Sequence, residues 1–97
     1  MSIYKIIRIN NSLYGGELKN GKPHGQGRIK YFFEGKAEAS YVGDFKDGKR
    51  DGFGKWIMFD GSGFYEGEWK LDKFHGKGTY RYLEEVKVGF WFMGRFK

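Results

Sequence analysis

The residues Tyr65-Glu-Gly-Glu-Trp69 and His75-Gly-Lys-Gly-Thr-Tyr-Arg-Tyr82 decide the fold of this chain. In both segments, aromatic residues or glycine alternate with mostly charged residues. This period of two sends successive side chains to opposite faces of a β-strand. The mostly polar residues between the segments suit a turn. The stretch therefore predicts a β-hairpin with one face of aromatic residues and glycine and one mostly charged face.

The same pattern occurs three times in the 97 residues. Each unit has a tyrosine, a glycine two residues later, and a glycine pair that starts nine residues after that glycine (25 minus 16, 52 minus 43, 76 minus 67). Self-similarity at this period is typical of an array whose units stack because none can bury its apolar face alone. We predict a single domain with repeats at 14–35, 41–61 and 65–83, a strand at 1–10 before them, and a partial repeat at 87–97.

The predicted fold is all-β: an open, twisted antiparallel sheet of consecutive hairpins. A glycine, which has no Cβ, leaves room for a ring from the opposite strand, so we expect aromatic rings to lie over glycines. If the second hairpin folds back symmetrically, the facing pairs are Tyr41 with Trp56, Gly43 with Gly54, and Phe45 with Gly52.

Composition limits the classes of function. The net charge of +6 favours acidic partners, although soluble domains without such partners also carry this charge. The absence of cysteine excludes disulfides, thiolate catalysis and Cys-based zinc sites. No stretch approaches the roughly 18 apolar residues of a membrane span, and the alternating N-terminus favours a strand over a signal peptide. We therefore expect a cytoplasmic protein, peripheral at the membrane if it binds lipid.

The two histidines are the first candidates for chemistry. His24 and His75 occupy the same position in their repeats, just before the glycine pair. We expect each to brace a turn by hydrogen bonding or ring packing. Two imidazoles on separate hairpins fall short of the three or four ligands of a zinc site, so we predict no metal site.

The carboxylates of the first strands are the second candidates. On the charged face of a strand they are expected to be solvated or ion-paired. An acid and base pair needs two of them to converge across a cleft, which a single-layer sheet does not offer. We predict no enzyme, no cofactor and no small-molecule substrate. The carboxylates in question are Glu17, Asp44, Glu66 and Glu68.

The repeated unit resembles the MORN repeat, whose units read approximately Tyr-x-Gly-x-Trp-x-x-Gly-x-x-His-Gly-x-Gly-x-x-x-Tyr. The similarity spans about residues 14–94 and includes several positions that recur together in three units. Leu18 replaces the aromatic residue, Asp51 the histidine and Asp72 the glycine. The resemblance implies a short solenoid-like array with a scaffolding or protein-binding role, often as a dimer, and membrane-lipid binding has been proposed for some members.

The aromatic face provides the first candidate binding surface. A single layer cannot cover all of its rings, and the rings left exposed form an amphipathic groove of the kind enriched at protein interfaces. The residues expected to line this partner-binding groove are Tyr41, Phe45, Trp56, Tyr65, Trp69, Tyr80 and Tyr82.

The C-terminal edge provides the second candidate surface. The partial repeat reaches Lys97 before any glycine pair, so its hairpin is expected to lack a second strand. Unpaired backbone groups there would accept a strand from a partner or from a second copy of the chain. The alternative is that this end frays or is covered by its own tail. The residues expected at this edge are Phe90, Trp91, Phe92 and Phe96.

The basic hairpin turns provide the third candidate surface. Stacked turns would form a stripe that binds lipid or nucleic-acid phosphates, more weakly as salt rises; acidic residues interleave with it, and nucleic acid is the less favoured ligand. We therefore predict a non-catalytic adaptor, scaffold or inhibitor that binds a protein, with peripheral binding of anionic phospholipid as the alternative. The candidate phosphate-binding residues are Lys46, Lys49, Arg50, Lys70 and Lys73.

Overall fold

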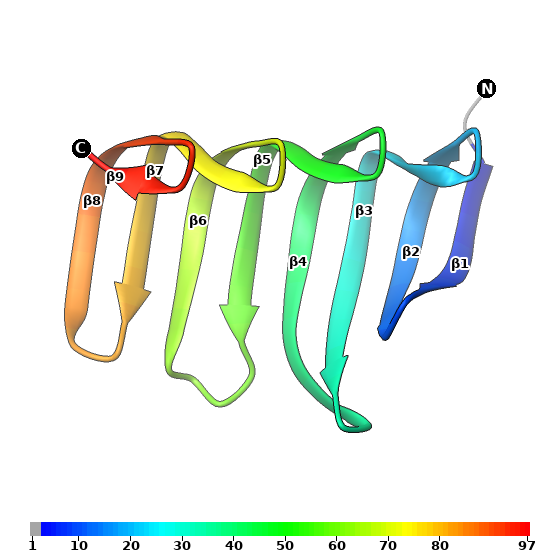
Figure 1. Ribbon diagram of the computed structural model, residues 1–97, viewed down its shortest axis with the longest axis horizontal. Coiled ribbons are helices and arrows are strands. Elements are labelled where there is room, and N and C mark those ends of the chain that lie inside the picture. Colours follow the sequence, from blue (N-terminus) through cyan, green and yellow to red (C-terminus); the bar gives the residue numbers. More distant parts are fainter. Residues whose placement is uncertain (1–2) are drawn as a thin grey trace.

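A computed structural model describes residues 3–97 as one open antiparallel sheet of nine strands (Figure 1). The strands follow one another across the sheet in chain order, and the extents of 38 × 29 × 15 Å are those of a single layer. The predicted all-β array of hairpins is confirmed; residues 1 and 2 of the expected first strand lie outside the described residues. The strands are β1 (Ile3–Ile9), β2 (Ser12–Lys19), β3 (Lys22–Phe33), β4 (Lys36–Lys46), β5 (Lys49–Met58), β6 (Gly63–Lys70), β7 (Lys73–Tyr82), β8 (Glu85–Phe92) and β9 (Arg95–Phe96).

The turns inside the repeats lie along one edge of the sheet. Figure 1 shows β2–β3, β4–β5, β6–β7 and β8–β9 turning at the top and the connections between repeats at the bottom. Both central residues of each such turn have positive φ, as two-residue hairpin turns of type I′ require. Asp72 adopts φ 69° where the other turns have glycine. This departure from the repeat therefore leaves the turn type unchanged.

Three tyrosines form the centre of the core. Tyr14, Tyr41 and Tyr65 are fully buried. Each hydroxyl donates a hydrogen bond to the backbone carbonyl oxygen three residues later, at 2.6 to 2.8 Å. Because a buried phenol must find a partner for its O–H group, this bond allows the ring to be buried completely.

The rings of successive repeats interlock edge to face. Tyr41 contacts Phe45 of its own repeat and Trp69 of the next, with ring centroids 5.1 Å apart in both cases. Trp69 also donates its indole N–H to the carbonyl oxygen of Gly54 on the neighbouring hairpin, at 3.1 Å. Aromatic pairs prefer this edge-to-face geometry. This edge-to-face series runs through Tyr14, Phe45, Tyr41, Trp69, Tyr65 and Trp91.

The second glycine of each pair lies under the tyrosine of the same repeat. A Cβ on Gly54 would lie 2.2 Å from the hydroxyl oxygen of Tyr41. Gly27 and Gly78 are equally close to their tyrosines. The expectation that rings lie over glycines is therefore confirmed, and it is the tyrosine ring that requires the glycine.

The expected pairing of Phe45 with Gly52 is wrong. Tyr41 lies opposite Trp56 and Gly43 opposite Gly54, but a β-bulge then shifts the register. Phe45 consequently pairs with Arg50, and Gly52 pairs with Trp69 of the next hairpin.

The bulges hold carboxylates that were expected to be solvated or ion-paired. The side chain of Asp44 accepts a hydrogen bond from the backbone N–H of Phe53 at 2.9 Å, and Glu68 accepts one from Lys77 at 2.7 Å. Gly52, with φ 113°, leaves room for this arrangement, since a Cβ there would lie 2.5 Å from Asp44 Oδ2. These carboxylates therefore satisfy backbone donors that the bulge leaves unpaired.

The residue before each glycine pair joins its hairpin to the turn of the next one. His24 Nδ1 accepts a hydrogen bond from the backbone N–H of Asp47 at 3.3 Å, and His75 Nδ1 accepts one from the β8–β9 turn at the same distance. Asp51 has the same role in the second repeat and accepts from the N–H of Leu71 at 3.2 Å. The prediction that the histidines brace turns is confirmed, and the turn belongs to the following hairpin.

The substitution Gly54→Ala is expected to lower the free energy of unfolding by about 1–3 kcal/mol, because the new methyl group overlaps Tyr41. Gly15→Ala is the matched control, since a Cβ at Gly15 would meet only Ile6, at 3.7 Å; its stability should stay within about 0.5 kcal/mol of the original or increase. Urea denaturation measures both, and equal stabilities would contradict the packing of Tyr41 on Gly54.

The sheet is expected to unfold in alkali because of its buried tyrosines. Burial raises the pKa of Tyr65 to about 12 and also raises the pKa of Tyr41. The folded state thus favours the neutral phenol, so this stabilisation is complete below about pH 10 and is lost as the pH rises from 10 through 12. Circular dichroism and tyrosinate absorbance should change together in this interval.

The variant Tyr65→Phe is the control for the alkaline transition, since phenylalanine cannot ionise. Its free energy of unfolding should fall less between pH 10 and 12 than that of the original chain. Complete tyrosine ionisation at pH 10 with unchanged circular dichroism would contradict the burial of these rings.

Candidate protein-binding surfaces

The two faces of the sheet leave different side chains exposed. The aromatic face carries the buried tyrosines, and the second face carries the side chains that alternate with them. The second face was expected to be mostly charged, but several of its large apolar side chains are 44% to 76% exposed. Apolar surface on this scale is typical of a face that contacts another molecule. These side chains are Ile6, Val42, Phe53, Val86, Val88, Phe90 and Phe92.

The aromatic groove is smaller than the sequence predicts. Four of its seven predicted residues are at most 5% exposed and belong to the core, so they cannot line a groove for a partner. Their rings are covered by the aromatic residues of neighbouring repeats. The buried residues are Tyr41, Phe45, Tyr65 and Trp69, whereas Trp56 and Tyr80 are half-buried and Tyr82 is exposed.

A shallow cavity of about 320 Å³ remains on the aromatic face, lined by Trp56, Arg50 and Phe74 among others. Arg50 was a candidate phosphate-binding residue. Its guanidinium lies 4.7 Å from the ring centroid of Trp69 and forms an ion pair with Asp72 at 3.0 Å. Arg50 is thus engaged within the sheet and does not project with the lysines of the turns.

The C-terminal edge differs from the expected one in two respects. β9 pairs with the end of β8, with Phe96 opposite Trp91, so the last hairpin has a short second strand. Trp91 is 6% exposed and donates its indole N–H to the carbonyl oxygen of Gly78 at 3.2 Å, so it belongs to the core. Phe90 and Phe92 are more than half exposed on the second face, and Phe96 is 41% exposed.

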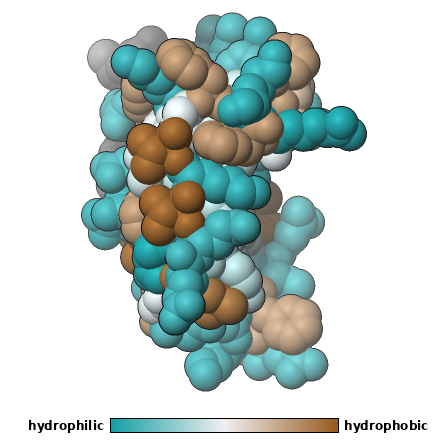
Figure 2. Space-filling view, turned by 90° about the vertical axis from the view of Figure 1, so that its left-hand side faces the viewer, coloured by the Kyte–Doolittle hydropathy of each residue, from teal (hydrophilic) through white to brown (hydrophobic). Residues whose placement is uncertain are grey.

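The outward side chains of β8 form a continuous apolar row, which we call the β8 strip. Its four residues alternate along the strand and are 56% to 67% exposed. Figure 2, which views the molecule from the β8 end, shows hydrophobic side chains gathered along this edge. The β8 strip consists of Val86, Val88, Phe90 and Phe92.

Sequence reasoning missed two residues of the β8 strip. Val86 and Val88 stand in the same period-two phase as Phe90, and this alternation is legible in the sequence. The prediction for this edge named only aromatic residues, among them Trp91, whose side chain lies on the opposite face.

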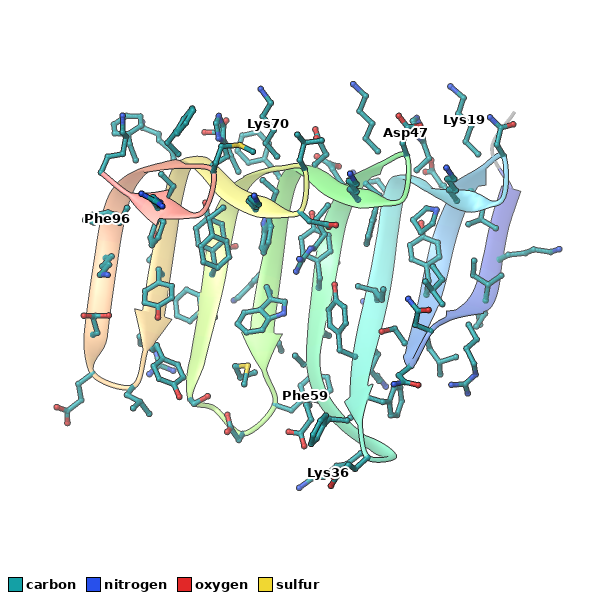
Figure 3. All side chains as sticks on the ribbon, viewed as in Figure 1. Lys19, Lys36, Asp47, Phe59, Lys70 and Phe96 are labelled. Atoms are coloured by element: carbon teal, nitrogen blue, oxygen red, sulfur yellow. The ribbon has the colours of Figure 1, made fainter. Side chains whose placement is uncertain are left out.

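Exposed lysines flank the turns, and we call them the lysine ladder. Lys46 lies opposite Lys49 across one turn, and equivalent pairs flank the neighbouring turns. Successive turns are two strand spacings apart, roughly 9–10 Å. Figure 3 shows Lys19 and Lys70 at this edge together with Asp47, which interrupts the positive charge. The lysine ladder consists of Lys19, Lys22, Lys46, Lys49, Lys70 and Lys73.

Residues 3–97 contain neither a candidate metal site nor a membrane-spanning helix. These residues contain no group of three or more His, Cys, Asp or Glu side chains placed to hold a metal ion. Within the same part of the chain, no helix is long and apolar enough to cross a membrane.

Comparisons with known proteins identify the repeats. Residues 14–32, 41–63 and 65–82 match the family model described as MORN repeat. The chain is 35% identical over 85 residues to Alsin from Rattus norvegicus and from Homo sapiens, an alignment that covers 84% of this chain and 5% of Alsin. It is 34% identical over 84 residues to MORN repeat-containing protein 3 from Xenopus laevis, which covers 81% of this chain and 34% of that protein. The chain therefore spans a small part of the length of these relatives.

Proposed function

Since the chain belongs to the MORN-repeat family, we propose that it is a non-catalytic module that binds a protein partner through the second face of its sheet. Repeats of this family commonly serve as membrane- or protein-interaction modules. The observation that carries the proposal is the β8 strip, where four large apolar side chains in a row are more than half exposed.

The energetics of the β8 strip favour a protein partner. Contiguous exposed apolar side chains mark contact sites, because leaving them in water forgoes roughly 25 cal/mol for each Å² that could be buried. Phenylalanine is also enriched in the buried centre of protein interfaces, and Phe90 and Phe92 each keep more than half of their surface in water.

The aromatic face is the weaker choice for this role. Its tyrosines and the aromatic residues between them already contact one another, so their surface is not available to a partner. The second face has no such internal use for Val86 or Val88. One face of the module stabilises the fold, and the other stays exposed and available to a partner. This division suits an adaptor, a scaffold or an inhibitor that covers its partner.

The substitution Val88→Glu is expected to weaken partner binding at least about tenfold, because it places a charge at the centre of the apolar contact. Phe33→Glu is the matched control, since it makes the same kind of change at the end of β3, away from the β8 strip, at a side chain that is 66% exposed. The measurement is capture of proteins by the immobilised chain, followed by the affinity of the captured protein for both variants. Equal affinities for the original chain and Val88→Glu would overturn the proposal.

Light scattering determines whether the partner is a second copy of the chain. A dimer that becomes a folded monomer in Val88→Glu identifies the copy as the partner, and a monomer in both excludes it.

A second candidate function is peripheral binding of anionic phospholipid by the lysine ladder. The supporting observation is that all six lysines are exposed and form no ion pair with a carboxylate of residues 3–97. Each lysine near an anionic membrane contributes about 1 kcal/mol, and the attraction falls with added salt.

The triple substitution Lys46→Glu, Lys49→Glu and Lys70→Glu is expected to abolish co-sedimentation with vesicles of phosphatidylserine and phosphatidylcholine. Protein capture through the β8 strip should remain, since the ladder lies at the edge of the sheet. Co-sedimentation that resists both these substitutions and high salt would rule out the ladder as the lipid-binding surface.

A further inference from the structure

Gly15 is a glycine that the backbone does not require. It lies on the second face of β2, opposite Arg28 and Ile6, at the position that the next repeat fills with Val42. Its φ lies outside the left-handed region, and a Cβ would meet only Ile6, at the ordinary contact distance of 3.7 Å. Unlike Gly54, it makes no room for a ring. Its missing side chain therefore has no explanation in the packing of the sheet.

The missing side chain leaves a hollow of about 490 Å³ on the second face. Apolar side chains from three different strands surround it, namely Ile6 of β1, Leu13 of β2 and Val42 of β4. Arg28, Lys30 and Gln26 of β3 complete the lining, together with Tyr14 and the glycine backbone of the floor. The hollow thus combines apolar walls with two cationic side chains.

The charge around the hollow is positive. Arg28 and Lys30 are exposed, and neither forms an ion pair with a carboxylate in the described part of the chain. Arg8 and Lys55 lie in the same cross-strand rows of this face, opposite Leu13 and Val42. The acidic side chains of β1 to β4 are Glu17, Glu38 and Asp44. Glu17 and Asp44 lie beside the glycines of the bulges, Glu38 lies near the start of β4, and Glu66 of β6 lies opposite Lys55.

The open shape of the hollow favours a side chain of a protein over a free small molecule as its occupant. A single-layer sheet cannot enclose a free small molecule, whereas pockets for such ligands bury 70–90% of the ligand surface. An apolar side chain carried by a partner is covered on its other side by the partner itself. Cations beside an apolar pocket favour carboxylates next to that side chain and disfavour basic segments.

We infer that the hollow over Gly15 receives an apolar side chain, such as leucine, from an acidic segment of the partner protein, with Arg28 and Lys30 attracting the flanking carboxylates. This inference rests on the proposed function of the second face in protein binding. It adds a second contact at the opposite end of that face from the β8 strip and assigns the partner a chemical character.

The test uses the full chain and three acetylated peptides. The probe Glu-Leu-Glu-Leu-Glu has the proposed chemistry, Glu-Ser-Glu-Ser-Glu lacks the apolar side chains, and Lys-Leu-Lys-Leu-Lys reverses the charge. In NMR titrations, the chemical shifts of the Gly15 and Gly27 amides should change and reach a plateau with the first peptide alone. Gly15→Val fills the hollow with the residue type of the next repeat and should weaken this binding at least tenfold, as should Arg28→Glu.

Three outcomes would overturn the inference. One is equal binding of the acidic leucine peptide to the original chain and Gly15→Val, and another is an equal response to the serine peptide, which would reduce the site to charge alone. The third combines two results: Gly15→Val weakens binding to phosphatidylserine vesicles, and the peptides leave the amide resonance of Gly15 unchanged. A membrane would then be the occupant of the hollow. Val88→Glu should leave the peptide titration unchanged, so the capture experiment tests the proposed function independently of the hollow.

Discussion

The contact between a buried tyrosine and a glycine backbone is the constraint on which the rest of the sheet depends. Tyr41 can lie over β5 only because Gly54 has no Cβ, and its hydroxyl then reaches the carbonyl oxygen of Asp44. With the ring held there, Phe45 and Trp69 can meet it from both sides. A layer 15 Å thick has no second sheet to cover its rings, so the rings of neighbouring repeats must cover one another.

The repeat pattern was sufficient to predict the hairpins, their order and the aromatic face, because alternation and glycine spacing act locally. It did not predict the bulge at Asp44, since the hydrogen bond from Phe53 to that carboxylate leaves no mark in a period-two pattern. The error in register placed Phe45 over the wrong residue. For the candidate site, the period-two phase of β8 is enough to place Val88 and Trp91 on opposite faces. How much of each side chain stays exposed depends on the packing between repeats, which the pattern does not describe.

Departures from the repeat are coupled at one junction, between the second and third hairpins. Arg50 stands where the third repeat has Phe74, and its guanidinium lies over Trp69 in place of a ring. Its ion-pair partner is Asp72, which occupies the turn position that is glycine in the other repeats. Asp51 replaces histidine and still receives the N–H of the next turn. Hydrogen-bonded charged side chains therefore replace at this junction the histidine and the aromatic ring that are present at the junction after the third hairpin.

Each strand of the sheet contacts mainly the strands before and after it in the chain. Duplicating or deleting one internal hairpin would therefore leave every other contact between neighbours intact and keep both faces in phase. The length of the array therefore changes in steps of one hairpin. Each hairpin inserted between the hollow over Gly15 and the β8 strip would separate these two surfaces by a further two strand spacings, roughly 9–10 Å. Repeat number would then set which partners can reach both surfaces at once.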